Sequence, residues 1–359
     1  MLAFGPASLP EARWRWDSFA PEEAAAGPMP PTKPELFDAK AAARFYDQRY
    51  AQGYMDDWPA WKKARIVEVV RALALPRSGR VLDYGCGAGS FHDALAEALP
   101  GWDRAGTELS AEALARARQR HPGADWFAPS EGEARRGGFD LVFSHHVLEH
   151  VASVEETWRD MERYLKPDGH MLHILPCGDV GSLERSLVEL RKGGIDPRHG
   201  DRFDFEDVAH LRRLTTAALG EVARARGFEL LGSLYANQLY GSLADILDSG
   251  PRHVWRITTP RRARGLGAAT LLVALRGALL PAATAAGVAR VQARLEARAQ
   301  HALPRLAWRA ARPAGALGRF LLERIHGRAA REWDEHQRGP GGAEMYLHFA
   351  RRRDRGGGC

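Results

Sequence analysis

The sequence predicts an α/β fold in which helices cover both faces of a mostly parallel sheet, and two stretches carry this prediction. Val81–Ser90, VLDYGCGAGS, is typical of a strand end, a tight glycine turn and a helix start. Phe139–Ser144, FDLVFS, is an almost continuous apolar run, as expected of a parallel strand buried on both faces. A strand, glycine-rich turn and helix in this order form a nucleotide-cofactor site in doubly wound folds.

The charge beside the glycine turn indicates which cofactor it binds. The dinucleotide fingerprint G-x-G-x-x-G needs a third glycine at the position that Ser90 occupies. The carboxylate of Asp83, two residues before the first glycine, would repel a pyrophosphate. S-adenosylmethionine (SAM) has no phosphate and carries an ammonium and a sulfonium group. The turn therefore favours SAM over NAD, and an NAD-dependent oxidoreductase is the less favoured alternative.

The pattern Asp83-x-Gly85-x-Gly87-x-Gly89 resembles motif I of the class I SAM-dependent methyltransferases. FDLVFSHHVLEHV, followed by LKPDGHMLHILP, resembles the methyltransferase type 11 domain family. The resemblance covers roughly residues 45–175. It implies a Rossmann-like, seven-stranded, mostly parallel sheet, a helical lid before the first strand, and methyl transfer from SAM.

An acidic residue follows the second predicted strand, Asp103–Thr107. This residue, Glu108, lies twenty-one positions after Gly87, and an acid at about this distance accepts hydrogen bonds from ribose hydroxyls. It matches the second motif of the family. The family often has an acid that binds the adenine amine just after the third strand, and Ser130 or Glu131 of this sequence is the candidate for that position. The expected SAM-binding residues are Asp83, Tyr84, Gly85, Cys86, Gly87, Gly89, Glu108, Leu109, Ser130 and Ser144.

Two histidines follow the fourth predicted strand, where the methyl group of SAM should point. A histidine can take a proton from a hydroxyl, an amine or an acidic carbon near neutral pH, so His146 and His150 are the candidate bases. The alternative is that they only orient the loop. Residues 146–150 also fit the zinc motif H-x-x-E-H. Because this segment follows a strand of a nucleotide fold, we expect no metal there.

Composition and pattern divide the chain into four parts. Residues 1–35 form an irregular arm, and residues 36–249 form the SAM-binding core with its N-terminal lid helices. A plausible last strand occurs only at Ala343–Arg353. Residues 250–342 are therefore expected to form a basic helical insertion in the last hairpin of the sheet. Residues 343–359 then supply the last strand and a basic tail.

The charge of the predicted insertion is strongly asymmetric. Residues 251–330 contain fifteen arginines, no lysine and two acids, a net charge of +13, whereas the whole chain carries +6. Gly265–Ala289 contains a single charge, Arg276, which disfavours a membrane span. Arginines beside an apolar helix suit an anionic membrane surface. A helical cap with a solvated basic face is the alternative, and nucleic acid is disfavoured because no aromatic-interleaved basic strand accompanies the charge.

These features together predict a SAM-dependent methyltransferase that acts on a small-molecule or lipid-like acceptor. The three cysteines have no metal-ligand spacing and fit a reducing compartment. We expect a cytoplasmic protein, with peripheral membrane contact through residues 250–342 as an open alternative. A non-catalytic, SAM-binding, membrane-associated module is the alternative function.

Overall fold

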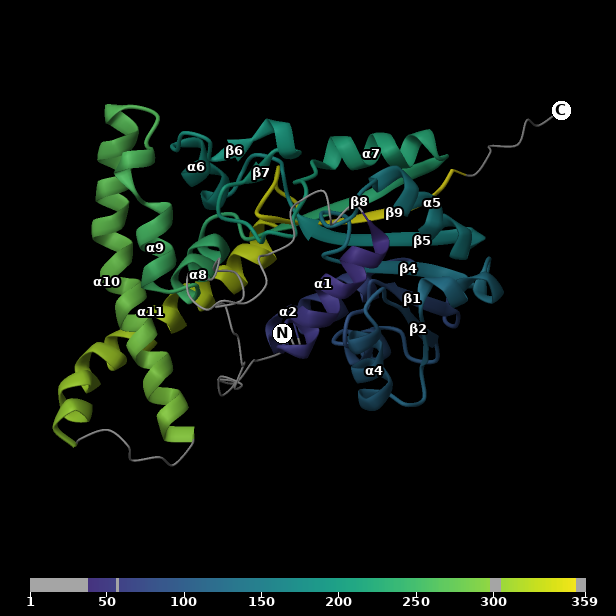
Figure 1. Cartoon of the computed structure of the whole chain (residues 1–359), viewed down its shortest axis with the longest axis horizontal. Coiled ribbons are helices and arrows are strands. Elements are labelled where there is room, and N and C mark those ends of the chain that lie inside the picture. Colours follow the sequence, from purple (N-terminus) through teal and green to yellow (C-terminus); the bar gives the residue numbers. More distant parts are fainter. Residues whose placement is uncertain (1–37, 56–57, 298–304, 353–359) are drawn as a thin grey trace.

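The computed structural model describes residues 38–55, 58–297 and 305–352, so the predicted arm 1–35 lies outside the described residues. Its centre is a seven-stranded sheet with the strand order β3-β2-β1-β4-β5-β9-β8 (Figure 1). The parallel strands are β1 (Arg80–Tyr84), β2 (Asp103–Thr107), β3 (Asp125–Phe127), β4 (Phe139–His145) and β5 (Leu165–Pro176). The strand β9 (Glu344–Arg351) is antiparallel to β5 and to β8 (Phe228–Ala236). The predicted seven-stranded, mostly parallel sheet is confirmed.

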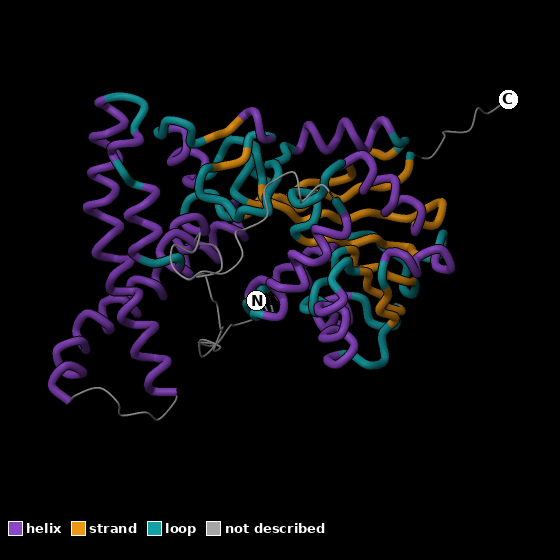
Figure 2. The backbone as a smooth tube through the Cα atoms, viewed as in Figure 1, coloured by secondary structure: helices purple, strands orange, loops and turns teal. Residues whose placement is uncertain are grey.

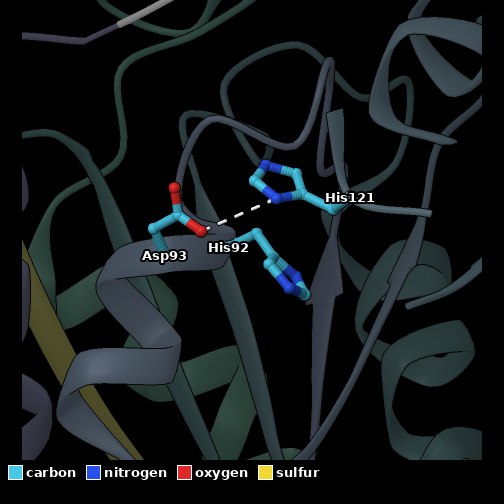
Figure 3. A group of neighbouring side chains, drawn as sticks. All are labelled: His92, Asp93 and His121. Atoms are coloured by element: carbon cyan, nitrogen blue, oxygen red, sulfur yellow. Dashed lines mark ion pairs between the residues drawn. The ribbon is translucent and has the colours of Figure 1, made fainter. Parts of the chain in front are cut away.

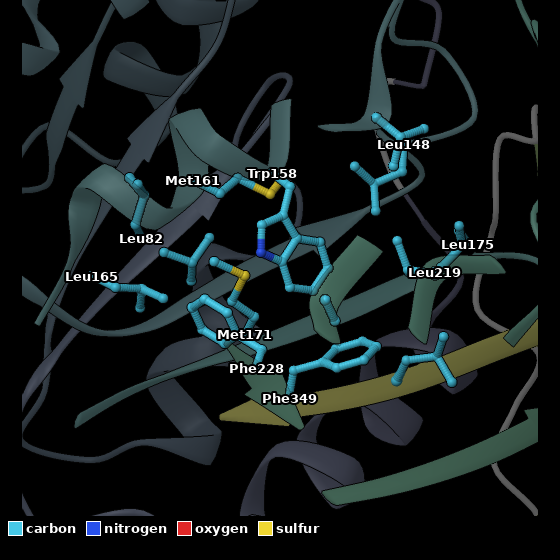
Figure 4. Packing of buried hydrophobic residues seen from close by; sticks show 14 of the residues in the cluster. Leu82, Leu148, Trp158, Met161, Leu165, Met171, Leu175, Leu219, Phe228 and Phe349 are labelled. Atoms are coloured by element: carbon cyan, nitrogen blue, oxygen red, sulfur yellow. The ribbon is translucent and has the colours of Figure 1, made fainter. Parts of the chain in front are cut away.

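Helices cover both faces of the sheet because its strands are apolar on both sides. On β1, Val81 packs in a buried cluster with α2 (Ala60–Ala72) and α3 (His92–Ala98). The next residue, Leu82, belongs to the cluster on the opposite face, with α5 (Val154–Tyr164) and α7 (Thr216–Ala225). Trp158 of α5 lies in the middle of that second cluster (Figure 4). The sheet is therefore doubly wound, as predicted.

Side-chain caps mark where the helices of the core begin. Ser110 precedes α4 (Ala111–Arg120), and its hydroxyl accepts a hydrogen bond from the Ala113 N–H at 3.1 Å, as predicted. Ser153 and Thr215 cap α5 and α7 in the same way. Gly227 follows α7 with a φ of +77°, a left-handed conformation that glycine adopts without strain.

Two helices precede β1, where the sequence predicted a lid. The first, α1 (Ala39–Ala51), lies against α4, and the second, α2, packs on the sheet and on α3. Asp38 caps α1 by accepting from the Ala41 N–H at 2.8 Å. Both helices therefore lie beside the carboxyl ends of β1 and β2, where the glycine turn is found.

Short elements connect β5 to α7. They are α6 (Leu183–Glu189), the two-stranded sheet of β6 (Ile195–Asp196) and β7 (Arg202–Phe203), and the 3₁₀ turn η4 (Pro197–His199). A similar 3₁₀ turn, η3 (Pro129–Arg135), follows β3. Arg191 holds this region together: its guanidinium pairs with Asp204 at 2.6 Å and is buried.

Residues between β8 and β9 form a helical insertion, which confirms the predicted break in the last hairpin. It consists of α8 (Tyr240–Asp248), α9 (Pro251–Ile257), η5 (Pro260–Arg262), α10 (Leu266–Ala297) and α11 (Arg305–His336). The first helix begins ten residues before the boundary we expected at residue 250. The helices α9, α10 and α11 stand beside one end of the sheet (Figures 1 and 2). Trp333 of α11 packs on Tyr346 of β9 and joins the insertion to the core.

The longest apolar stretch lies on α10. Leu266–Ala293 has the length and the composition of a membrane span, and 28% of it is buried inside the protein. One side of α10 packs in a cluster with α6, α8, α9 and α11, in which Leu272 is fully buried. Leu271 and Val273, which flank Leu272 on the helix surface, are each 54% exposed.

Candidate functional site

The glycine turn lies at the carboxyl end of β1, at the middle of the sheet. Gly85, Gly87 and Gly89 have φ values of +74°, +52° and +74°. A Cβ atom on Gly85 would lie 2.5 Å from Cγ2 of Val147, and one on Gly87 would lie 2.5 Å from the hydroxyl of Tyr50. Only glycine fits these conformations and this space. The turn therefore lets backbone N–H groups face a ligand directly.

Glu108 follows β2 and binds the turn from its other side. Its Oε2 accepts from the Gly87 N–H at 3.0 Å, and its Oε1 accepts from the Ser110 N–H at 3.0 Å. Burial raises the pKa of Glu108, although these backbone hydrogen bonds oppose the shift. The sequence placed this acid beside the glycines correctly. It did not predict that the carboxylate would also hold the turn in position.

Asp83 is the buried acid just before the glycine turn. Its side chain is buried, and its Oδ2 has no hydrogen-bond partner among the described residues. Burial, and to a smaller degree the Glu108 carboxylate, raise the pKa of Asp83 to about 8. A buried carboxylate without a donor is destabilising unless a cation neutralises it. The site therefore fits a cationic group, and this agrees with the ammonium and sulfonium of SAM.

A cavity of about 2030 Å³ opens around the turn. Ligand sites usually enclose about 300–1,000 Å³, so this cavity has room for a cofactor and a second molecule. Its walls come from the turn, the lid helices α1 and α2, the loop after β4, the segment 205–213 and the insertion. The lid aromatics Tyr46, Tyr50 and Tyr54 line it, and Tyr50 lies nearest the turn.

Most of the predicted site residues line this cavity, and three do not. The lining residues are Asp83, Tyr84, Gly85, Cys86, Gly87, Glu108, Leu109, His146 and His150. Gly89 faces away, towards Trp126 and His121. The hydroxyl of Ser144 lies 2.8 Å from Nδ1 of His173 inside the sheet, and Ser130 is exposed on η3. These three residues therefore do not line the cavity, and their cofactor contacts stay predictions.

The two predicted bases differ in what surrounds them. His146 has a φ of +54°, and its ring lies between two carboxylates: Nδ1 is 2.9 Å from Oε1 of Glu149, and Nε2 is 3.0 Å from Oε1 of Glu344. Burial opposes a positive charge on this ring, but the two carboxylates outweigh it and raise the pKa of His146. Both ring nitrogens of His146 therefore face acceptors, and neither is free to take a proton from a substrate.

His150 is held as a neutral ring. Its Nδ1 lies 3.1 Å from the carbonyl oxygen of Ala209, so Nδ1 carries the proton and Nε2 keeps its lone pair. Burial lowers the pKa of His150 to about 4, and nearby His210 adds to the shift, although Glu149 opposes it. The ring of Tyr46 packs edge-on against it. His150 is therefore uncharged at neutral pH.

Several lining residues were missed by the sequence reasoning because they are distant in the chain. Glu344 of β9 pairs with Lys62 of α2, and it also accepts from the Tyr346 hydroxyl at 2.6 Å. His210, from the segment before α7, packs against His150. Asp245 of α8 is half-buried, and this burial, with Asp248 nearby, raises its pKa to about 7. The sequence carries no local signal for these partners.

The insertion supplies the far wall of the cavity. Arg252 and Arg256 come from α9, and Arg290 from α10. Arg290 pairs with Asp248 at 3.0 Å, and Arg256 donates to the Phe205 carbonyl at 3.2 Å. Part of the positive charge predicted for the insertion therefore faces the cavity rather than the outer surface.

Comparisons with known proteins agree on one domain type. Residues 58–232 match the family model described as a methyltransferase domain. The chain is 31% identical over 139 residues to YqeM of Bacillus subtilis (strain 168), which is provisionally named a methyltransferase; the match covers 36% of this chain and 52% of YqeM. It is 30% identical over 130 residues to the trans-aconitate 2-methyltransferase of Paracidovorax citrulli, covering 34% of this chain and 48% of that protein.

Among solved structures, the chain is similar to the YcgJ protein from Bacillus subtilis. The TM-score is 0.39 at 16% identity, and the match covers 55% of this chain and 82% of YcgJ. The chain spans about half the length of the two curated relatives. The region that the family model matches, residues 58–232, includes the glycine turn and the strands beside it and ends before the insertion.

Proposed function

We propose that this protein, whose residues 58–232 match the family model described as a methyltransferase domain, transfers a methyl group from SAM to a small-molecule acceptor. The observation that carries the proposal is the buried Asp83 side chain, whose Oδ2 has no hydrogen-bond partner among the described residues, beside a glycine turn whose backbone a ligand can approach closely. When bound, SAM supplies the reactive methyl group on its sulfonium. The chain's own residues then bind and orient the two reactants.

The cofactor half of the cavity is built by the turn and by Glu108. The backbone at Gly85 and Gly87 allows close approach, and Asp83 offers its charge to a cationic group. The Glu108 carboxylate lines the same cavity and has lone pairs left for ribose hydroxyls. NAD fits less well because its pyrophosphate would lie near two carboxylates.

The acceptor half lies between the loop after β4 and the insertion. The size of the cavity supports a second ligand beside the cofactor. The name of the trans-aconitate 2-methyltransferase relative supports an acceptor of small-molecule size, and a lipid-like acceptor remains the alternative. Because positioning in a dry site supplies much of the rate of such transfers, a dedicated base is not required. We propose that His146 positions Glu149 and Glu344, and that His150 presents its Nε2 to the acceptor half.

Calorimetric titration with S-adenosylhomocysteine (SAH) and with NAD tests this proposal. We expect one molecule of SAH to bind per chain and NAD not to bind. Gly87→Val should abolish SAH binding because its side chain would meet the Tyr50 hydroxyl. The matched control is Gly123→Val, since a Cβ at Gly123 meets nothing within 4 Å. Binding of NAD in place of SAH would overturn the proposal.

Turnover separates the enzyme from a non-catalytic SAM-binding module. The purified chain is incubated with SAM labelled on its methyl group and with a metabolite extract. Transfer of the label to an extract component supports catalysis. SAH binding without any label transfer in extracts, vesicle lipids and protein fractions would favour the non-catalytic module.

We further propose that the exposed apolar side chains of α10 contact an anionic membrane surface reversibly. On α10, Leu266 is 90% exposed and Leu271 and Val273 are each 54% exposed, and Arg261 lies just before this helix. Exposed apolar side chains beside arginines suit an interfacial helix. A soluble cap would instead bury these side chains, as the structure does for Leu272.

Co-sedimentation with phosphatidylserine vesicles tests the membrane proposal. Wild-type protein should pellet at low salt and be released at high salt, because the arginine contribution is screened. Leu271→Asp should reduce pelleting, whereas Leu231→Asp, an exposed leucine on β8, should not. Protein that stays in the supernatant at low salt would refute the membrane contact.

A further inference from the structure

Among the described residues, three groups of histidine and carboxylate side chains are close enough to hold a metal ion. In each group the potential ligand atoms lie within 4.8 Å of one another. The groups are His92, Asp93 and His121; His145, His146 and Glu344; and Glu149, His150 and His210. In the first two groups an arginine or a lysine contacts one of the candidate ligand residues, whereas in the third group the neighbour of Glu149 is the imidazole of His146.

The first two groups each have a basic side chain in place. In the first, the rings of His92 and His121 face each other and Asp93 reaches towards His121 from the surface (Figure 3). Arg104 donates from Nε to Nε2 of His92 at 3.4 Å. In the second, the ammonium of Lys62 pairs with Glu344. A metal ion at either group would have to displace or repel a guanidinium or an ammonium.

The third group contains a buried carboxylate that is poorly satisfied. The side chain of Glu149 is fully buried, and neither of its oxygens accepts a well-formed hydrogen bond. His146 approaches Oε1 at 2.9 Å as an ion pair only. Buried carboxylates normally have several donors, so this carboxylate has coordination capacity left.

A ring nitrogen of His150 and one of His210 lie close to the carboxylate of Glu149. The Nδ1–H of His150 donates to the Ala209 carbonyl at 3.1 Å, which leaves Nε2 as an acceptor 3.9 Å from Oε1 of Glu149. A histidine whose other nitrogen donates to a backbone carbonyl has the arrangement that metal ligands usually have. Nδ1 of His210 also has no hydrogen-bond partner, and its nearest acid, Glu206, lies 3.8 Å away and is held by Arg213.

We propose that Glu149, His150 and His210 bind a divalent transition-metal ion, with Zn²⁺ as the best match. Two imidazole nitrogens and one carboxylate oxygen are a known zinc donor set. In a tetrahedral site with bonds of about 2.0–2.2 Å, ligand atoms lie about 3.4 Å apart, so the 3.9 Å separation needs only a small rotation of one side chain. The remaining coordination position would face the cavity, because His150 and His210 line it and Glu149 lies behind them.

This site differs from the H-x-x-E-H arrangement that the sequence suggested and that we expected to be empty of metal. Residues 146–150 form a turn after β4 rather than a helix, so His146 and His150 do not share a helix face. The third ligand comes from His210, sixty residues later in the chain. If the proposed methyl transfer is correct, the ion would bind an oxygen of the acceptor and lower its pKa, so that the acceptor could lose its proton to water without a dedicated base.

The test measures metal binding directly on the full-length chain. The protein is treated with chelator, titrated with Zn²⁺ by calorimetry, and its metal content is determined by mass spectrometry after gel filtration. We expect one Zn²⁺ per chain. His150→Ala, His210→Gln and Glu149→Gln should each weaken Zn²⁺ binding by more than about 100-fold, since even outer-shell partners contribute about 10–100-fold. His121→Ala, from the surface group, is the matched control and should bind Zn²⁺ as wild type does.

The outcomes separate the metal site from the proposed function. SAH binding is measured on the same variants and should be retained, which also shows that each variant is folded. Absence of bound Zn²⁺ in wild type, or Zn²⁺ binding that persists in His150→Ala and His210→Gln, overturns the metal site. Loss of binding in His121→Ala assigns the ion to the surface group and overturns it too. A chain that binds Zn²⁺ but not SAH would refute the methyltransferase proposal and leave the metal site standing.

Discussion

The protonation of Asp83 should control how tightly this protein binds SAM. Burial raises the pKa of the Asp83 carboxyl to about 8, so the ligand-free protein holds it mostly protonated at pH 7. A cationic ligand needs the ionised form, because only that form neutralises its charge. SAM binding should therefore release a proton and become tighter as the pH rises towards 8.

The size of this effect follows from the pKa. With a pKa of about 8, roughly one molecule in a hundred is ionised at pH 6 and about one in ten at pH 7. If the bound complex keeps Asp83 ionised throughout, the apparent Kd should fall about tenfold from pH 6 to pH 7, which is about 1.4 kcal/mol. Above pH 8 the dependence should disappear. An Asp83 carboxyl with an ordinary pKa would give no such slope above pH 6.

Calorimetry between pH 6 and 7.5, in buffers of different ionisation enthalpy, measures both the affinity and the number of protons released. Asp83→Asn keeps the size of the side chain and removes its ionisation. It should bind SAM more weakly and show no pH slope, and it corrects for titration of the SAM ammonium itself. A wild-type affinity that is flat between pH 6 and 7.5, or a slope that persists in Asp83→Asn, would refute the reasoning.

Two further changes test the site and its supports. Glu108→Ala should weaken SAM binding by about 1–3 kcal/mol and lower the Tm, because the ribose hydroxyls and the Gly87 N–H lose their acceptor; an unchanged Kd by calorimetry would contradict the ribose role. Lys62→Met should lower the free energy of unfolding by about 3–5 kcal/mol, because it leaves the buried Glu344 without its ammonium partner. Lys166→Met breaks an exposed pair with Asp140 and should cost about 0–1 kcal/mol in urea denaturation; equal losses in the two variants would contradict the assigned burial.

The fold and the cofactor turn were predictable because their signals are local. The left-handed φ values at Gly85 and Gly87 follow from sterics within a few residues, and the apolar run of β4 reports burial on both faces. The spacing between Gly87 and Glu108 is one strand–turn–helix–strand unit, which brings the two residues within 3.0 Å of each other in the structure. The break in the last hairpin was also readable, because the pattern of β9 occurs only near residue 344.

A local sequence pattern does not determine which way a side chain near the end of a strand points. Ser144 lies on β4 only two residues before His146, yet its hydroxyl contacts His173 on the neighbouring strand β5. Successive side chains of a strand point to opposite faces of the sheet. A residue near the end of a strand can therefore point away from the cavity that its neighbours line. Ser130 was placed by analogy with a family position, and the turn η3 exposes it instead.

The sequence by itself determined the class of the fold, the glycine turn with its two acids, and the insertion between the last two strands. Only the tertiary structure decided what surrounds the histidines. Glu344 reaches His146 across 198 residues because β9 inserts between β5 and β8, and His210 reaches His150 across sixty because the segment before α7 folds over the loop after β4. Contacts of this kind depend on strand order and on loop path. They leave no periodic or spacing signal in the chain, because each partner is chosen by the fold rather than by its neighbours in sequence.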